Sequence, residues 1–351
     1  MRVLFCGLGG IGQRHLRNLR SLVPQEQLQV HAYRVLGRSE KLRDDLSIEA
    51  DRSIVTDYEI VVHIDMESAL AVRPDVVFIC NPSSLHTGIA LQAARAGAHL
   101  FIEKPVSDTM DGLDELLAIV KAKQLVCYVG YNFRFHPALM RIKALLVQGH
   151  FGNLLAVRSE IGEYLPNWHR YEDYRTMYAA RADLGGGVIL SQIHEMDLIY
   201  WYFGLPGSIY CLGGKLSHLE IDVEDTATSL MQYDGPLGNF PIALHQDYLQ
   251  RPPARTFKVV GDQGLAQVDL IRNQLTVYNA GGEIVEQWDG SDFKRNDMFL
   301  AQIKHFLASV AGQTAPEVNL WDGMQSMRLA LAAKESMASQ TVVFLKQELA
   351  P

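Results

Sequence analysis

The strongest constraint on the fold is an alternation, within the first 130 residues, of short apolar runs and segments with helical spacing. The apolar runs cover residues 3–6, 29–33, 60–64, 76–80, 100–102 and 126–129. Between them, residues 12–22, 89–96 and 113–123 carry apolar side chains at the spacing of an amphipathic helix. The run at 76–80 is apolar throughout, which is typical of a strand covered on both faces. This alternation predicts a parallel sheet whose strands are joined by helices.

After residue 130 the pattern changes to longer strands in which apolar and polar residues alternate. These strands are expected at residues 156–160, 208–212, 226–233, 240–247, 255–260 and 275–278. Two helical segments, 296–310 and 321–339, follow them and either pack on this second sheet or return to the first domain. We therefore predict a doubly wound parallel sheet in a first domain, residues 1–127. A second, α+β domain with a large open mixed or antiparallel sheet spans residues 128–351.

The first apolar run leads directly into the sequence GLGGIG, the glycine pattern of a dinucleotide-binding turn. In this pattern Gly7 permits the tight turn, Gly9 lets a pyrophosphate approach the backbone, and Gly12 packs the helix on the strand. The helix N-terminus supplies free N–H groups and a positive dipole to the phosphates. A Rossmann domain is therefore predicted, with Gly7, Leu8, Gly9, Gly10, Ile11 and Gly12 at the cofactor.

The end of the second strand bears on the choice between NAD and NADP. NAD-binding domains place an acid about 20 residues after the last glycine, to bind the ribose hydroxyls. Here that position is Tyr33, followed by Arg34, and no carboxylate would repel a 2′-phosphate. Arg34 and Arg38 can pair with that phosphate or stack on the adenine, which favours NADP over NAD. The alternative is that Arg34 only caps a strand in solvent.

Composition narrows the class of partner. The 351 residues are 48% hydrophobic, enough for sizeable cores, and the formal charge is −8 with a pI near 5.8. Because acids and bases are interspersed, a nucleic-acid groove or a basic membrane patch is excluded and a small-molecule ligand is expected. No run approaches the about 18 apolar residues of a membrane span, and the first strand starts too early to leave room for a signal peptide. The four cysteines lack CxxC spacing and lie in or beside apolar runs, so we expect reduced thiols, a cytoplasmic location and no metal site.

Four motifs beyond the fingerprint follow predicted strands or lead into the second domain. Asn81, Pro82 and His86 belong to the sequence NPSSLH after the fourth strand, and Glu103-Lys104-Pro105 follows the fifth. A triple glycine at 185–187 leads to the sequence HEMD at 194–197, and GYNFRFHP at 130–137 enters the second domain. In this order, the chain resembles the glucose–fructose oxidoreductase and inositol dehydrogenase family (Gfo/Idh/MocA) nearly end to end.

The resemblance has two departures. Ser83 stands where the family has asparagine after the proline. The family places an aspartate four residues before the histidine, and here that position is Leu190, with Ser191 beside it. A catalytic aspartate is therefore missing, so the active-site chemistry is expected to differ.

The resemblance implies an oxidoreductase in which Lys104 and His194 are the catalytic groups, with a cis peptide between Lys104 and Pro105. One group accepts the hydroxyl proton and the other stabilises the developing alkoxide. The alternatives are a surface ion pair for Lys104 and a core position for His194. The further cofactor residues are expected to be Asn81, Pro82, His86, Glu103, Lys104 and Asn132.

The segment 162–175 is dense in aromatic and hydrogen-bonding side chains and poor in aliphatic ones, which suits a polyhydroxylated ligand or an oligomer interface. Asp197 is expected to orient the imidazole or bind substrate hydroxyls. The predicted substrate-binding residues are Tyr131, Arg134, Tyr164, Trp168, His169, Arg175 and Asp197.

Together these features predict an NAD(P)-dependent dehydrogenase or reductase for a sugar, nucleotide sugar or cyclitol. Two alternatives stay open, a reductase of a different acceptor such as a ketosugar or imine, and a dinucleotide-binding regulatory protein without turnover. By analogy with the family, a homodimer or homotetramer is expected.

Overall fold

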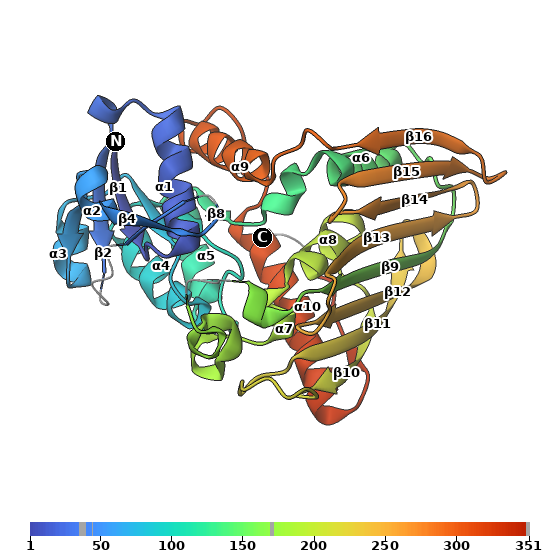
Figure 1. The fold of residues 1–351 in the computed structure, drawn as a ribbon. Coiled ribbons are helices and arrows are strands. Elements are labelled where there is room, and N and C mark those ends of the chain that lie inside the picture. Colours follow the sequence, from blue (N-terminus) through green and yellow to red (C-terminus); the bar gives the residue numbers. More distant parts are fainter. Residues whose placement is uncertain (35–39, 44, 169–171, 349–351) are drawn as a thin grey trace.

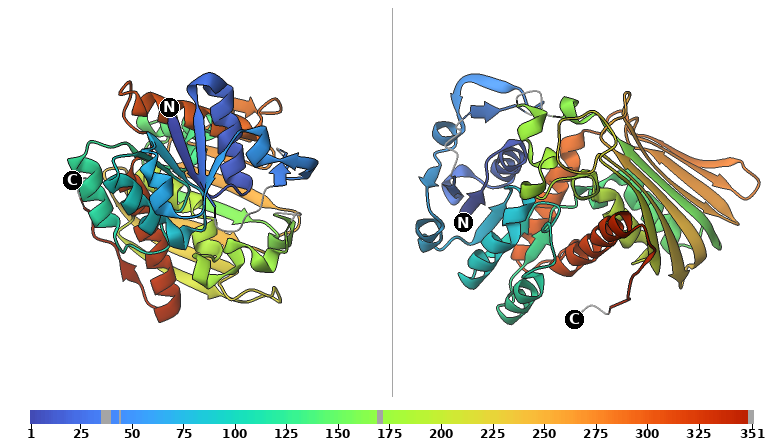
Figure 2. Two further views of the ribbon diagram at one scale, coloured as in Figure 1. Left: turned by 90° about the vertical axis from the view of Figure 1, so that its left-hand side faces the viewer. Right: turned by 90° about the horizontal axis from the view of Figure 1, so that it is seen from below.

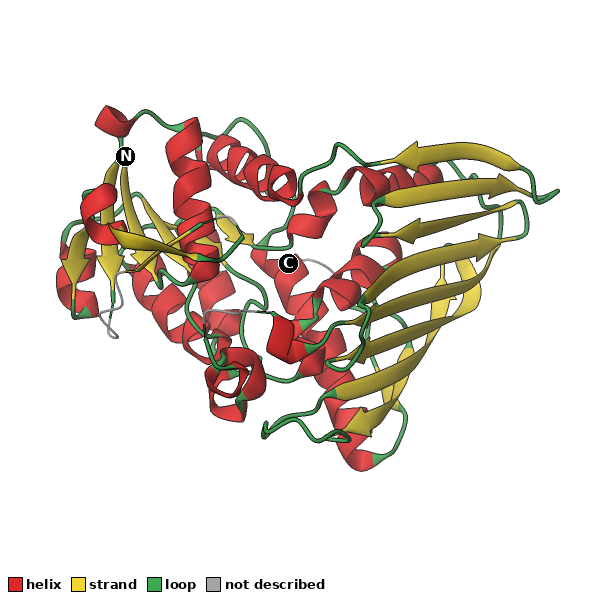
Figure 3. Cartoon of the chain, viewed as in Figure 1, coloured by secondary structure: helices red, strands yellow, loops and turns green. Residues whose placement is uncertain are grey.

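The computed structural model describes residues 1–34, 40–43, 45–168 and 172–348. Two sheets face one another across the middle of the molecule, each with its own helices (Figures 1 and 3). None of the described helices combines the length and the apolar composition that a membrane crossing requires.

The first sheet has six parallel strands in the order β5-β2-β1-β6-β7-β8. These are β1 (Arg2–Cys6), β2 (Gln29–Tyr33), β5 (Val61–His63), β6 (Val76–Ile79), β7 (His99–Ile102) and β8 (Cys127–Val129). They are joined by α1 (Gly10–Leu22), α2 (Ile54–Asp57), α3 (Met66–Ala71), α4 (His86–Arg95) and α5 (Leu113–Ala122), with a hairpin of β3 (Glu40–Leu42) and β4 (Ile48–Ser53) inserted after β2. All four residues of β6 are buried. The predicted Rossmann fold is confirmed, and only the small hairpin and the short helices α2 and α3 were not predicted.

The second sheet has nine strands in the order β16-β15-β14-β13-β9-β12-β11-β10-β17. They are β9 (Leu154–Gly162), β10 (Ser208–Gly214), β11 (Thr226–Gly235), β12 (Gly238–Asp247), β13 (Ala254–Gly261), β14 (Gly264–Asp269), β15 (Gln274–Asn279), β16 (Ile284–Asp289) and β17 (Val343–Phe344). Only the central pair β9 and β12 is parallel, so the predicted mixed sheet is confirmed. The strands β14, β16 and β17 were not predicted: β14 and β16 begin directly after glycine-containing turns, and β17 has only two residues.

One face of the nine-stranded sheet is covered by α6 (Pro137–Val147), α8 (His194–Phe203) and α10 (Leu320–Ser339), and no described helix lies on the other face (Figure 2). The side chains of β11 follow this asymmetry. Ala227, Ser229 and Met231 are buried, whereas Leu230 between them is 56% exposed. The alternation read from the sequence thus separates a packed face from an open one.

The C-terminal helices connect the two sheets. α9 (Arg295–Val310) lies against α1, where Asn296 donates to Asn18 at 2.9 Å, and α10 packs on β10 and α8. The backbone N–H of Val129 in β8 donates to the carbonyl of Val318, just before α10, at 3.0 Å. Helix α9 thus returns to the first domain, whereas α10 packs on the second sheet, so each of the two predicted alternatives holds for one helix. The predicted domain boundary, between residues 127 and 128, falls inside β8, which is a strand of the first sheet. The division into two domains stays a prediction.

Candidate active site

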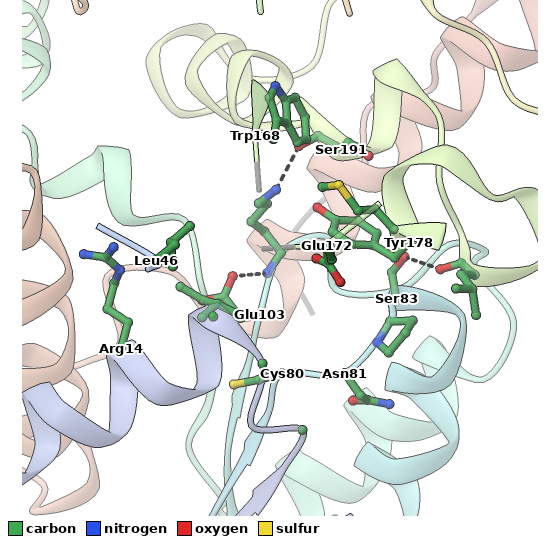
Figure 4. Close-up of a pocket in the computed structure, with 18 of the residues that line it drawn as sticks. Arg14, Leu46, Cys80, Asn81, Ser83, Glu103, Trp168, Glu172, Tyr178 and Ser191 are labelled. Carbon is green, nitrogen blue, oxygen red and sulfur yellow. Dashed lines mark hydrogen bonds between the residues drawn. The ribbon is translucent and has the colours of Figure 1, made fainter. Parts of the chain in front are cut away.

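A cleft of about 1960 Å³ lies between the two sheets, at the carboxyl ends of β1, β6 and β7, and Figure 4 shows part of its lining. In a doubly wound sheet this edge is where ligands bind. The second sheet and its preceding loops supply the opposite wall, with residues such as Ile161, Gln192 and Arg255. The cleft holds most of the predicted site.

The fingerprint turn forms one end of this cleft. Gly7 has a φ of +98°, and a side chain there would collide with the backbone of Asn81 and Cys80 at 2.8 Å. Helix α1 begins at Gly10, and its first helical bond runs from Gln13 N–H to the Gly9 carbonyl at 2.9 Å. The N–H groups before Gln13 are thus available to an anion, and a Cβ on Gly9 would meet no atom within 4 Å. These features fit a pyrophosphate.

The NPSSLH segment forms the neighbouring wall. Both polar atoms of the Asn81 carboxamide are enclosed and have no hydrogen-bond partner, although the residue lines the cleft. His86 is buried with its two ring nitrogens 2.8 Å from the carbonyl oxygens of Asn81 and Pro105. It therefore holds the two strand-end loops together. The free carboxamide of Asn81 is the group here that a ligand would satisfy.

The adenosine end of the cleft contains Tyr33 and Arg34, as the sequence suggested, and Arg38 lies outside the described residues. Burial lowers the pKa of Arg34 from its ordinary value, and nearby Glu40 partly offsets this. Glu40 also lines the cleft, and sequence analysis missed it because it follows the strand end by several residues. This end thus carries both a cation and an acid.

Lys104 lies at the end of β7, on the opposite side of the cleft from α8. The implied cis peptide between Lys104 and Pro105 is present. The ammonium Nζ donates to the carbonyl oxygen of Ser191 at 2.8 Å (Figure 4). Glu103 is buried beside it, 2.6 Å from Nε2 of His15, and accepts a bond from the Lys104 N–H at 3.2 Å. Glu103 is therefore a buried positioning group as well as a cleft residue.

His194 lies at the first residue of α8, because the apolar run that contains it is divided into α7 (Val188–Ser191) and α8. It is only 9% exposed and contacts Phe133 edge-on at 4.8 Å between ring centroids. Burial lowers the pKa of His194 well below its usual value, and Lys104, Arg255 and Arg295 lower it further. The positive end of the α8 dipole acts in the same direction. The imidazole is therefore neutral at physiological pH and able to accept a proton.

The two departures from the family pattern have distinct surroundings. Leu190 is buried away from the cleft, whereas Ser191 lines it and contacts Lys104 through its carbonyl. Position 191, not 190, is therefore the one that contacts the lysine, and it does so through its backbone carbonyl. Ser83 donates to the carbonyls of Leu184 and Gly185 at 3.2 and 3.1 Å, so it fastens the first domain to the glycine-rich loop.

Only some residues of the segment 162–175, which is rich in aromatic side chains, line the cleft. Tyr164 and Trp168 line it, Tyr164 beneath the guanidinium of Arg251 at 4.0 Å and Trp168 edge-on to Tyr248 at 5.3 Å. His169 lies outside the described residues. The indole N–H of Trp168 is enclosed and has no hydrogen-bond partner.

Four of the predicted substrate-binding residues need a correction, because the structure places them outside the cleft lining. Asp197 is 1% exposed, and its carboxylate is taken up by the guanidinium of Arg134 at 2.7 and 3.0 Å and by Ser326 at 3.0 Å. Tyr131 is buried edge-on against His194 at 5.8 Å, and Arg175 is paired with Asp173 and Glu220 at the surface. Asp197 and Arg134 are thus an internal ion pair, and Tyr131 supports the imidazole from behind.

Sequence analysis also missed cleft residues. These are Arg251, Arg255 and Arg295, which line the second-domain wall next to Glu163 of the predicted segment 162–175. None belongs to a recognisable motif, and only the folded chain brings β13 and the start of α9 to the same cavity. Among the described residues, no group of three His, Cys, Asp or Glu side chains is arranged to hold a metal ion.

Comparison with known proteins adds two kinds of finding. The family model described as an oxidoreductase family with an NAD-binding Rossmann fold matches residues 1–131, and that of the GFO/IDH/MocA C-terminal domain matches residues 139–267. The myo-inositol 2-dehydrogenase of Thermotoga maritima is 24% identical over 99% of both chains. The UDP-N-acetylglucosamine 3-dehydrogenase of Acidithiobacillus ferrooxidans is 28% identical over 76% of this chain and 78% of its own.

Among solved structures, the WlbA dehydrogenase of Bordetella pertussis, in complex with NADH and UDP-GlcNAcA, has a similar fold. Its TM-score is 0.79 at 18% identity, over 99% of both chains. At that identity the likeness concerns the fold alone.

Proposed function

Because the chain belongs to the Gfo/Idh/MocA family of NAD-binding oxidoreductases, we propose that it transfers a hydride between a nicotinamide and a substrate carbon. That carbon is a carbinol or carbonyl carbon of a sugar, nucleotide sugar or cyclitol. The observation that carries the proposal is that Lys104 and His194, from separate domains, line one cleft that also contains the fingerprint turn. The named relatives act on inositol and on UDP-N-acetylglucosamine, in keeping with a polyhydroxylated substrate.

In the oxidation of a hydroxyl group, different residues of the cleft bind the cofactor, accept the proton and stabilise the developing charge. When bound, the nicotinamide supplies the acceptor or donor of the hydride. The free amides at the start of α1 and the carboxamide of Asn81 would hold the cofactor. The neutral imidazole of His194 accepts the substrate hydroxyl proton. The Lys104 ammonium, held by the Ser191 carbonyl, donates to the same oxygen and stabilises its developing charge.

In the reverse direction Lys104 polarises a carbonyl and protonated His194 returns the proton. A specific observation also favours reduction of a ketosugar or imine as a second candidate. Within the described residues no carboxylate contacts the Lys104 ammonium, whose hydrogen-bond partner is the backbone carbonyl of Ser191. An unneutralised ammonium is the stronger hydrogen-bond donor to a carbonyl oxygen.

The test combines cofactor binding with turnover. Purified protein is titrated with NADH and NADPH by nicotinamide fluorescence, and sugars, cyclitols and their oxidised forms are then screened for cofactor turnover. Lys104→Ala should reduce turnover by about 10²–10⁴-fold and leave cofactor affinity nearly unchanged. Lys121→Ala, on the exposed face of α5, is the charge-matched control. Cofactor binding without turnover across the whole screen would instead favour a regulatory protein.

For the cofactor we propose that both forms are accepted and that Arg34 favours NADP. Arg34 and Glu40 both line the adenosine end of the cleft, one suited to a 2′-phosphate and the other to ribose hydroxyls. Arg34→Ala should lower the ratio of NADPH to NADH affinity by about tenfold, the effect of one charge-assisted contact. An unchanged ratio would remove Arg34 from cofactor selection.

We also propose that two copies associate through the open face of the nine-stranded sheet, where Leu212 and Leu230 are more than half exposed. Light scattering on a sizing column should give a dimer or tetramer. Leu230→Arg should give a smaller species, and Val147→Arg, on the exposed side of α6, should not. A cytoplasmic location is proposed from the four free, buried cysteines, which are typical of a reducing compartment.

A further inference from the structure

The second-domain wall of the cleft carries positive charge that the protein itself leaves unneutralised. Arg295, the first residue of α9, lines the cleft. Within the described part of the chain its guanidinium has neither a hydrogen bond nor an ion pair. Glu163 lines the same wall and acts on Arg295 at longer range, without forming an ion pair with it. A guanidinium with five donors and no partner in a cavity is prepared for an anion.

Arg255 is the second cation, and it is fixed in place. Its Nε donates to Oε1 of buried Glu195 at 2.7 Å, and its guanidinium lies over the ring of Phe133 at 4.1 Å. Phe133 in turn contacts the His194 imidazole at 4.8 Å. Only Nε of Arg255 is used in these contacts, so the terminal nitrogens remain for a ligand. The chain of contacts places this guanidinium one aromatic ring away from the catalytic imidazole.

The electrostatic environment of His194 also indicates that positive charge is concentrated on this side of the cleft. Lys104, Arg255 and Arg295 all lower the pKa of the imidazole, and Arg255 contributes, after burial, to lowering that of Arg295. Arg255 and Arg295 thus repel each other beside an imidazole that Lys104 also approaches, and an anion placed between the two guanidinium groups relieves that repulsion.

We propose that Arg255 and Arg295 bind an anionic group of the substrate, a carboxylate or a phosphate, next to the reacting carbon. The physiological substrate is then an acidic sugar or cyclitol and not a neutral one. This assignment rests on the proposed function, because it takes Lys104 and His194 as the reacting end of the cleft. The amides of α1 already provide for the cofactor pyrophosphate at the first-domain wall, and Arg255 is held entirely by second-domain contacts.

The experiment measures binding, not turnover, so that it gives a result even if no substrate is turned over. Calorimetry of the protein with bound NADH uses three probes: glucose, glucuronate and glucose 6-phosphate. The wild type should bind at least one anionic probe about tenfold more tightly than glucose, and the tighter of the two identifies carboxylate or phosphate. Equal binding of all three probes, or no binding of either anion, would overturn the proposal.

Variants then assign the effect to the two arginines. Arg295→Gln should remove most of the preference for the anion and change glucose binding less than threefold. Arg255→Lys keeps the ion pair with Glu195 but loses the planar donor pair, so it should give an intermediate loss. Arg272→Gln, exposed on the turn after β14, controls for net charge.

Two further outcomes would contradict the subsite. An equal loss in Arg272→Gln would show a general charge effect. A loss of NADH affinity in Arg295→Gln as large as the loss for the anion would assign Arg295 to the cofactor. Failure of the proposed function looks different, since Lys104→Ala would then leave turnover unaltered whatever the anion preference.

Discussion

Single residues of the fingerprint turn have opposite surroundings although they are three positions apart. A Cβ on Gly12 would lie 2.3 Å from the Gly7 carbonyl oxygen, whereas one on Gly9 would meet nothing within 4 Å. The packing of the fold therefore requires a glycine at position 12. No protein atom requires one at position 9, where the free space suits a bound ligand. This contrast separates a structural glycine from one that leaves room for a ligand.

The pair gives a matched prediction. Gly12→Ala should lower the melting temperature by several degrees, because backbone must shift to relieve the overlap. Gly9→Ala should melt within about 2 °C of the wild type in the absence of cofactor but bind NADH about tenfold or more weakly. Thermal melts with and without NADH check both. Full cofactor affinity in Gly9→Ala would contradict the assignment of this turn to the pyrophosphate.

At the scale of elements, the cleft is fixed from behind by a buried ion pair. Arg134 comes from the 3-10 turn Asn132–Phe135, Asp197 from α8, and Ser326 from α10 adds a hydrogen bond to the same carboxylate. Arg134 also donates to the Glu317 carbonyl at 3.2 Å. Three elements that are distant in the sequence are thereby held together beneath His194.

We expect Asp197→Asn to destabilise the fold by about 3–5 kcal/mol, because it removes the closer carboxylate of buried Arg134 and leaves Asp322, at 3.6 Å, as the nearest counter-charge. The measurement is urea unfolding. Asp183→Asn removes an aspartate paired with Arg181 at the surface, where solvent screens the pair, and should leave the free energy of unfolding nearly unchanged. Similar costs for the two variants would mean that the buried pair is not a structural tie.

For the whole molecule, buried histidines determine part of the response to acid. His136 is 1% exposed between Trp288 and Phe293, and burial lowers its pKa from 6.5 to about 4. Below pH 6.5 the unfolded chain binds a proton at this residue that the folded chain does not. Its contribution to stability is therefore present above pH 6.5 and is lost progressively down to about pH 4.

A variant isolates this contribution from the carboxylates that titrate in the same range. The loss attributable to His136 is about 1.4 kcal/mol per pH unit, or about 3 kcal/mol over the interval. His136→Gln should be less stable than the wild type at pH 7.5, and its stability should fall less steeply between pH 6.5 and 4.5. Urea unfolding at several pH values measures both slopes. Parallel curves would contradict the depressed pKa.

The sequence by itself determined the first sheet, the mixed character of the second and the position of the fingerprint turn, whereas the assignment of Lys104 and His194 to one cleft came from the family resemblance. Strand and helix periods are local, and the carboxyl ends of parallel strands necessarily meet at one edge, so these features need no knowledge of distant contacts. Only the tertiary structure decided which charges remain free. Asp197 is neutralised by Arg134, Arg175 by Asp173 and Glu220, and Arg255 and Arg295 reach the cleft from elements that no motif marks. The physical reason is that the partner of a charge is set by long-range packing, which residue spacing along the chain does not encode.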